Sequence, residues 1–242
     1  LDSLQGRGPS QIFTPVVGLP ELEALVYCWT FFETNIHSRS YSHIIRNIYN
    51  VPKEIFNTIH DTKEIVDMAS SVGNYYDRLH VINCRKETGE QIDEREHIKA
   101  IWLALHASYA LEAFRFMVSF ATSLAMVENR IFIGNGNIIS LILQDEILHK
   151  DWTAYIINQA VKEDARFKAA QVECEEEVYQ MYMDVIREDA ARVRAVREAV
   201  GPSVELFIDA NCNLDLYHAT KIAEMVKPYG ISFFEEPLTQ ND

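Results

Sequence analysis

Glu146-Ile147-Leu148-His149 is the stretch of this 242-residue chain that decides its fold. Two side chains that are three residues apart in a helix lie on the same face, so this carboxylate and this imidazole point in one direction. A helix bundle that binds two metal ions takes one Glu-x-x-His pair from each of two helices and a single Glu from each of the other two. Such a pair is common in helices, so it indicates a helix bundle that holds metal in its core only together with the other ligands of the set.

The other members of such a ligand set lie earlier in the chain. Glu33 and His37 form a similar pair, but three residues separate them where the pattern has two. Asp2 and Glu112 are solitary carboxylates, and Tyr41 follows His37 by one helical turn. The six candidate metal ligands are Asp2, Glu33, His37, Glu112, Glu146 and His149.

Carboxylates and imidazoles together suit a pair of divalent transition-metal ions. Four carboxylates roughly neutralise two such ions and can bridge them, and two imidazoles add nitrogen ligands. Glu112 and Glu146 both lie in otherwise apolar helical sequence, where an acid is costly unless something neutralises it. Each ligand alone has an ordinary structural explanation; Glu112, for example, could be a buried acid paired with Arg115. Their joint occurrence on successive predicted helices favours the metal site.

Composition and charge limit the classes of protein that the chain can represent. Hydrophobic residues make up 48% of it, and the formal net charge is −14. The first value supports a folded core, and the second argues against a nucleic-acid or anionic-membrane partner. Four cysteines without C-x-x-C spacing fit reduced thiols. No signal peptide is visible, and no apolar run reaches the roughly 18 residues of a membrane span.

Helices are expected over most of the chain. Residues 1–19 are expected to be a loop, because glycine and proline recur there. Helices are expected at about 20–49, 94–129, 138–160 and 164–200, with shorter helices within 53–83 and a turn at 134–136. Apolar runs at 204–209 and 231–235, joined by a helix at 214–227, predict a βαβ unit with a parallel strand pair. We therefore expect a mainly α bundle over 1–187 and a βαβ module over 188–242.

Several of these motifs resemble those of one family. They are Asp2-Ser3-Leu4-Gln5-Gly6-Arg7, Ile36-His37-Ser38-Arg39-Ser40-Tyr41, His43-Ile44-Ile45-Arg46-Asn47, Leu111-Glu112-Ala113-Phe114-Arg115-Phe116 and Asp145-Glu146-Ile147-Leu148-His149. Over about residues 1–187 the chain resembles the small, radical-generating subunit of class I ribonucleotide reductase, in its bacterial and phage form. The resemblance implies a ferritin-like bundle whose di-iron centre activates dioxygen and generates a tyrosyl radical, which a large subunit uses to make deoxyribonucleotides.

The resemblance also assigns roles to individual residues. The six candidate ligands would hold two iron ions per chain, with manganese as an alternative metal. Tyr41 would hold the stable radical, and Asp145 would orient a histidine ligand. Phe116, Phe120 and Ile142 would form the apolar pocket that shields the radical from water. The family further implies a homodimer and a large-subunit partner, in the cytoplasm.

The chain departs from the family pattern in three ways. The extra residue between Glu33 and His37 would rotate the rest of a regular helix by about 100° relative to Glu33. We therefore expect either a π-helical turn near residues 34–36 that absorbs it or the loss of one ligand. The other two departures are the lack of the family's N-terminal segment, with its radical-transfer tryptophan, and of the C-terminal tail that docks on the large subunit. With Leu1 as its first residue, the chain is expected to be an excerpt of a longer protein.

The C-terminal module resembles a different family. Its motifs are Arg192-Val193-Arg194-Ala195-Val196-Arg197-Glu198-Ala199-Val200-Gly201, Phe207-Ile208-Asp209-Ala210-Asn211 and Phe233-Phe234-Glu235-Glu236-Pro237. Over residues 190–242 they resemble the enolase superfamily, of the mandelate racemase and muconate cycloisomerase type, a (β/α)₈ barrel with Mg²⁺ at the C-terminal ends of its strands. Asp209 and Glu235 match two of its Mg²⁺ ligands. The Lys-x-Lys pair and a third ligand are missing, so solvated acids in a barrel fragment are the alternative.

Four functions remain open on these grounds. The first is a ribonucleotide reductase small subunit, and the second is another ferritin-like di-iron oxidase. The third is a Mg²⁺-dependent lyase or isomerase argued from residues 190–242 alone, and the fourth is a chimera that catalyses nothing. Tyr41 beside His37, together with the apolar pocket, favours the first.

Overall fold

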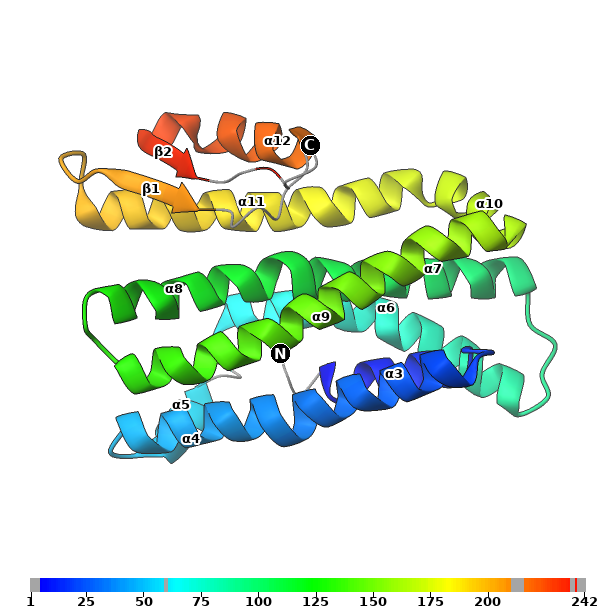
Figure 1. Cartoon of the computed structure of the whole chain (residues 1–242). Coiled ribbons are helices and arrows are strands. Elements are labelled where there is room, and N and C mark those ends of the chain that lie inside the picture. The colour runs from blue at the N-terminus through cyan, green and yellow to red at the C-terminus, as the bar shows by residue number, and fades with distance from the viewer. Residues whose placement is uncertain (1–4, 59–60, 210–215, 236–237, 239–242) are drawn as a thin grey trace. The chain divides into compact units, whose positions relative to one another are not determined.

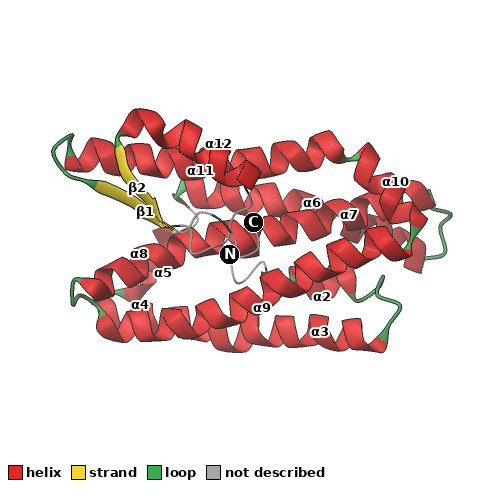
Figure 2. Cartoon of the chain, turned by 45° about the horizontal axis from the view of Figure 1, so that its top comes forward, coloured by secondary structure: helices red, strands yellow, loops and turns green. Residues whose placement is uncertain are grey.

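The computed structural model describes residues 5–58, 61–209, 216–235 and 238 of the chain. These form two compact units, Leu1–Glu175 and Glu176–Asp242. The first unit is helical in its described residues, whereas the second combines helices with a pair of strands (Figures 1 and 2). A mainly α bundle followed by a βαβ module is therefore confirmed.

The candidate ligands Glu33 and His37 lie in one uninterrupted helical rod. Helix α3 (Pro20–Phe31), the π-helical turn η1 (Phe32–His37) and helix α4 (Ser38–Ile48) follow one another directly. Pro20 begins the rod in its first turn, where a missing backbone N–H costs nothing. The rod ends before α5 (Pro52–Thr58), which starts at a second proline. The helix expected over about 20–49 is thus confirmed.

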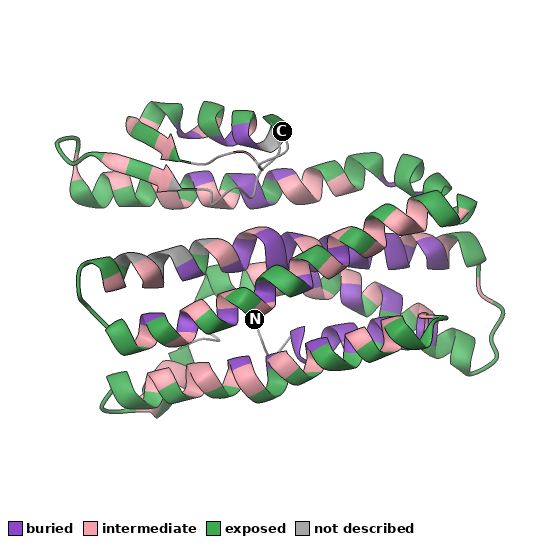
Figure 3. Cartoon of the chain, viewed as in Figure 1, coloured by how far each residue is buried: buried purple, intermediate pink, exposed green. Residues whose placement is uncertain are grey.

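A second rod carries Glu112 through the middle of the first unit. It consists of α7 (Glu94–Ala110), the π-helical turn η3 (Leu111–Arg115) and α8 (Phe116–Glu128). Asp93 caps it by accepting hydrogen bonds from the backbone N–H groups of Arg95 and Glu96. Residues 100–108 of α7 are all buried, and purple recurs along the visible part of this rod in Figure 3. A helix that is buried on every side belongs at the centre of a bundle.

The remaining helices of the first unit pack around these two rods. α6 (Lys63–Glu87) packs on α7 and on the short α2 (Gly8–Phe13), and α10 (Ala165–Glu173) packs on α7 and α9. α9 (Ile133–Glu163) packs on α7 and α8 and contacts both π-helical turns. The helix that carries the Glu-x-x-His stretch therefore meets both rods at the places where their own candidate ligands lie.

Three local expectations were wrong. The expected loop at 1–19 contains α2, because a proline within the first helical turn does not prevent a helix. Residues 53–83 hold one long helix, α6, after the short α5. Residues 134–136 are helical, and the chain turns instead just before α9, where Arg130 and Phe132 have φ angles of 60° and 52°. Glycine and proline interrupt a helix only where packing against neighbouring helices does not stabilise it.

The second unit is built from a long helix and a two-stranded sheet. α11 (Glu175–Val200) leads to β1 (Leu206–Asp209), α12 (Leu216–Val226) and β2 (Ile231–Glu235), and the two strands pair in parallel. Both strands and their parallel pairing were expected and are confirmed. The guanidinium of Arg197, near the end of α11, donates hydrogen bonds to the carbonyl oxygens of Gly201, Val204, Tyr229 and Gly230. One side chain thus ties the end of α11 to the start of β2.

The boundary expected between residues 187 and 188 lies inside α11, which continues without a break to Val200. The packing divides the chain earlier, after Glu175. The division into compact units does not test where the resemblance to one family ends. The boundary between residues 187 and 188 therefore stays a prediction.

Within the described part of the chain, every helix is too short or too polar to cross a lipid bilayer.

The packing of α8 on α9 predicts that Gly136 tolerates no side chain. A Cβ atom on Gly136 would lie 1.9 Å from Cγ2 of Val127 in α8. We expect Gly136→Ala to lower the free energy of unfolding by about 1–3 kcal/mol, because an overpacked core must shift. Gly134→Ala is the matched control, since nothing lies within 4 Å of its Cβ position. It should leave stability unchanged or slightly raised, and equal effects of the two in urea denaturation would contradict this packing.

Candidate metal centre

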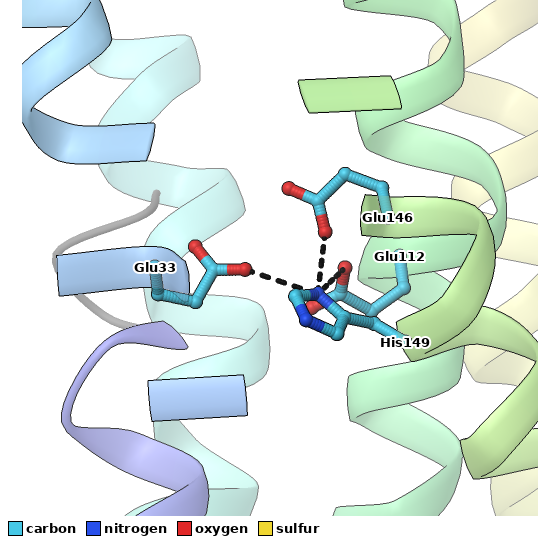
Figure 4. A group of neighbouring side chains, drawn as sticks. All are labelled: Glu33, Glu112, Glu146 and His149. Atoms are coloured by element: carbon cyan, nitrogen blue, oxygen red, sulfur yellow. Dashed lines mark hydrogen bonds and ion pairs between the residues drawn. The ribbon is translucent and has the colours of Figure 1, made fainter. Parts of the chain in front are cut away.

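A compact group of acids and an imidazole lies in the first unit (Figure 4). Its members are Glu33 from η1, Glu112 from η3, and Glu146 and His149 from α9. One ligand atom of each lies within 4.8 Å of those of the others. All four side chains are fully buried. Because carboxylates without access to water are costly unless their charge is compensated, the group requires a cation.

His37 extends this group. Its Nδ1 lies 3.2 Å from Oε1 of Glu146 and 3.5 Å from Oε1 of Glu33. On the other side of the ring, Nε2 lies 3.1 Å from Oδ2 of Asp145. When Nε2–H donates to Asp145, Nδ1 presents its lone pair to the acids, which is the tautomer that a metal ligand needs. The structure thus brings together five of the six candidate ligands, and Asp2 lies outside the described residues.

The π-helical turn η1 takes up the extra residue between Glu33 and His37. The backbone N–H of Ser38 bonds to the carbonyl oxygen of Glu33, five residues earlier, and the Ser38 hydroxyl donates to the same oxygen at 2.9 Å. Asn35 and its neighbour Thr34 are exposed, whereas Glu33 and His37 are fully buried. Of the two outcomes expected from the spacing, the structure has the π-helical turn. Both side chains reach the buried group.

One imidazole nitrogen faces three carboxylates. Nδ1 of His149 lies 2.8 Å from Oε2 of Glu146, 3.3 Å from Oε1 of Glu33 and 3.7 Å from Oε2 of Glu112. Burial alone would lower the pKa of His149, but the nearby carboxylates of these three acids raise its pKa to about 11. Burial, and then repulsion from Glu112, raises the pKa of Glu146 well above its usual value. Without a metal, the group therefore recovers part of the missing positive charge from a proton on His149.

Two buried carboxylate oxygens of this group lack a bonding partner in the part of the chain that the structure describes. Oε2 of Glu33 and Oε2 of Glu112 have no hydrogen-bond partner among the described residues. An unsatisfied buried acceptor costs about 1–3 kcal/mol, and more when it is charged. Divalent transition-metal ions accept carboxylate oxygens and imidazole nitrogens as ligands. The donor set and its unsatisfied oxygens fit a metal-binding site.

Residues to which the sequence pattern assigned no role support the ligands from behind. The ring of Trp29 stacks on His149 with 5.1 Å between centroids, and the Thr153 hydroxyl donates to the His149 carbonyl oxygen at 2.8 Å. Trp29 lies four residues before Glu33, and this helical spacing predicts that both lie on one face with His37 and Tyr41. The amide of Gln5 donates to Glu112, which is 107 residues away in sequence. No local pattern signals a contact of that range.

The residues expected to hold and shield a radical lie on three helices. Phe116, Phe120 and Ile142 are 5%, 2% and 1% exposed, and the two phenylalanine rings lie 6.1 Å apart between centroids. Tyr41 is half-buried on α4, one helical turn after His37. The roles of all four stay predictions.

The two acids expected to bind Mg²⁺ lie in the second unit. Asp209 and Glu235 are opposite each other in the register of β1 and β2, and the side chain of Glu235 is exposed. Their role as ligands stays a prediction.

Comparison with known proteins relates most of the chain to one family. The family model described as ribonucleotide reductase, small chain, matches residues 1–214. A ribonucleoside-diphosphate reductase subunit beta of Haemophilus influenzae is 39% identical over 204 residues, which cover 79% of this chain and 54% of the relative. The subunit beta of Enterobacteria phage T4 is 39% identical over 212 residues, with coverages of 78% and 54%. The chain thus spans about half the length of the curated relatives it matches.

A shorter match relates part of the chain to another enzyme. A D-galactarolactone cycloisomerase of Agrobacterium fabrum is 40% identical over 53 residues, which are 22% of this chain and 14% of the relative. Segment 190–242 has the same length. A match to so small a part of an enzyme carries no statement about activity.

The π-helical turn η1 predicts opposite effects on metal binding when one residue is removed from it and when one is added. Deleting Asn35 leaves Glu33 and the histidine three residues apart, so a regular helix holds both on one face and metal binding should be retained. Inserting one alanine after Asn35 turns His37 by about a further 100°, which should lower metal affinity about tenfold or more. Metal content per chain after dialysis measures both. Loss on deletion, or full retention on insertion, would contradict the role given to η1.

The electrostatics predict that Glu146→Gln separates stability from metal binding. Because burial raises the pKa of Glu146, its ionised form opposes folding near neutral pH. A neutral amide of the same shape should therefore raise the melting temperature of the metal-free protein while lowering metal affinity about tenfold or more. Asp151→Asn, an exposed acid on the same helix, is the control and should change neither quantity. A variant that binds metal as tightly as the original chain would exclude Glu146 as a ligand.

Proposed function

The chain belongs to the ribonucleotide reductase small-chain family, and from that premise we propose that it acts as the radical-generating subunit of ribonucleoside-diphosphate reductase, an oxidoreductase. The observation that carries the proposal is the buried group of three acids and an imidazole, whose ligand atoms lie within 4.8 Å of one another. The negative charge of this group exceeds its positive charge, and several of its carboxylate oxygens have no hydrogen-bond partner among the described residues. Both features suit a site for divalent metal ions.

Each residue of the centre has a task in this proposal. Two iron ions per chain, with manganese as the alternative, would be held by Asp2, Glu33, His37, Glu112, Glu146 and His149. When bound, the ions supply the reduction of dioxygen and the oxidising power to remove an electron from a phenol. Asp145 accepts the Nε2–H of His37 and so keeps its Nδ1 directed inward. Trp29 holds the ring of His149 by stacking.

Tyr41 is the residue on which the stable radical would reside. It follows His37 by one helical turn on the same rod. A tyrosyl radical persists only where water and reductants are excluded. Phe116, Phe120 and Ile142 are buried apolar side chains and would provide that exclusion.

The family also supports proposals for partners and location. Its members are subunits of a reductase, so we propose a large subunit that receives the radical and reduces ribonucleotides, and a homodimer of this chain. A cytoplasmic location fits the metabolic role. A net charge of −14 opposes nucleic acid and anionic membranes as partners.

A different ferritin-like di-iron oxidase is the second candidate, because the same buried ligands would serve it equally well. The two candidates differ at Tyr41, which only the first one requires as a radical carrier. For the second unit we propose that Asp209 and Glu235 bind Mg²⁺. Their pairing in the register of the two parallel strands supports this proposal.

The proposal predicts a tyrosyl signal that depends on Tyr41. Metal-free protein given ferrous iron and then dioxygen should take up about two iron ions per chain and show a tyrosyl radical by electron paramagnetic resonance. Tyr41→Phe should keep the iron and lose the signal, because phenylalanine has no phenolic proton. Tyr155→Phe, at a tyrosine that is 63% exposed, is the control and should keep both. Two bound iron ions without any radical in the original chain would favour the second candidate.

A further inference from the structure

A chain of hydrogen bonds leads from Glu112 away from the metal centre. Nε2 of Gln5 donates to Oε1 of Glu112. Oε1 of Gln5 accepts the hydroxyl proton of Tyr76 at 2.6 Å, and that hydroxyl lies 2.7 Å from Oγ of Ser108. We call Gln5, Tyr76 and Ser108 the Gln5 relay. Its members are 0%, 3% and 0% exposed, so water cannot substitute for any of them.

Only one orientation of the Gln5 amide satisfies both of its neighbours. The amide N–H of Gln5 faces Glu112, because a carboxylate oxygen of Glu112 accepts it. The amide oxygen then faces Tyr76, which must donate. Burial raises the pKa of Tyr76 far above its usual value, so the phenol keeps the proton that this arrangement needs. The relay thus delivers one N–H to one defined oxygen of Glu112.

Packing holds the relay in place. A Cβ atom on Gly8, in α2, would lie 2.5 Å from two ring carbons of Tyr76, so the ring sits directly on the backbone of that helix. Further along α6, Nδ2 of Asn83 donates to the carbonyl oxygen of Ile12 in α2 at 2.9 Å. Both contacts tie α2 to α6. Gln5, a few residues before α2, therefore cannot shift without disturbing buried packing.

We propose that the Gln5 relay is a positioning device that gives the two oxygens of Glu112 different tasks; the proposal rests on the proposed metal centre. Oε1 is occupied by the amide N–H of Gln5. Oε2 has no hydrogen-bond partner among the described residues and lies 3.7 Å from Nδ1 of His149, on the side of the other ligands. Glu112 therefore presents one oxygen to the metal centre, in an orientation that the relay fixes.

The sequence pattern assigns none of the three relay residues a role. Gln5 contacts Glu112 across 107 positions, and Tyr76 contacts Gln5 across 71. A purely structural role is the competing explanation, since buried hydrogen bonds also stabilise a fold. The two explanations differ in what they predict for metal binding by a variant that still folds.

Tyr76→Phe is the variant that separates them. It removes the hydroxyl that orients Gln5 but keeps the ring that packs on Gly8. Co²⁺ is the probe, because it binds oxygen and nitrogen ligands without dioxygen and its visible absorption reports ligand geometry. We expect Tyr76→Phe to weaken Co²⁺ binding about tenfold or more and to change the absorption spectrum. Tyr27→Phe is the control, since Tyr27 also donates to an acid, Glu23, but at the surface, and it should leave both unchanged.

Two further variants test the order of the relay. Gln5→Leu removes the N–H itself and should weaken Co²⁺ binding at least as much as Tyr76→Phe. Ser108→Ala removes the last contact of the relay, together with the hydrogen bond from the Ser108 hydroxyl to the Ala104 carbonyl oxygen. It should have a smaller effect, about threefold. If Tyr76→Phe does not fold, Ser108→Ala decides alone: weaker Co²⁺ binding supports the relay, and unchanged binding overturns it.

The outcomes distinguish the relay from the proposed function. A Tyr76→Phe protein with a lower melting temperature in the metal-free state but unchanged Co²⁺ affinity and spectrum would make the relay merely structural. An original chain that binds about two Co²⁺ ions, yet forms no tyrosyl radical with iron and dioxygen, would refute the radical function and leave the relay intact. A chain that binds no Co²⁺ would refute both.

Discussion

Confinement of three carboxylates away from water is the constraint on which the rest of this structure depends. Glu33, Glu112 and Glu146 are fully buried and close together, and their mutual repulsion can be relieved only by positive charge. Two of them sit in π-helical turns, η1 and η3, and α9 contacts both turns. A π-helical turn re-aims side chains locally without ending a helix. The bundle can therefore bend three ligands toward one point while keeping long, well-packed rods.

Much of this was predictable from the sequence, for reasons that particular residues illustrate. The rods follow from long apolar helical segments, and the extra residue near Asn35 indicated a π-helical turn because the number of residues between Glu33 and His37 can be counted in the sequence. The helix α2 was missed because Pro9 indicates a break only when packing offers no helical alternative. Gln5 was missed because its partners are distant in sequence and are brought near only by tertiary folding.

The C-terminal part illustrates a different limit of sequence reasoning. The likeness to one family runs to residue 214 and a short match to another enzyme covers 53 residues, yet α11 continues without interruption through the expected boundary. Arg197, near the end of that helix, donates two hydrogen bonds to the loop before β1 and two to the loop before β2. The helix is thus continuous at the residues where the sequence predicted a boundary.

The burial of three acids beside one another has a consequence for the life of the protein in a cell. A chain that folds before metal arrives carries an internally strained core, and any ion that binds only the folded form shifts the equilibrium toward it in proportion to the logarithm of its free concentration. When metal is scarce, a larger fraction of molecules is therefore unfolded at any moment and open to proteases. Cellular abundance of this chain should accordingly track metal supply, so that turnover itself removes copies that lack their ions.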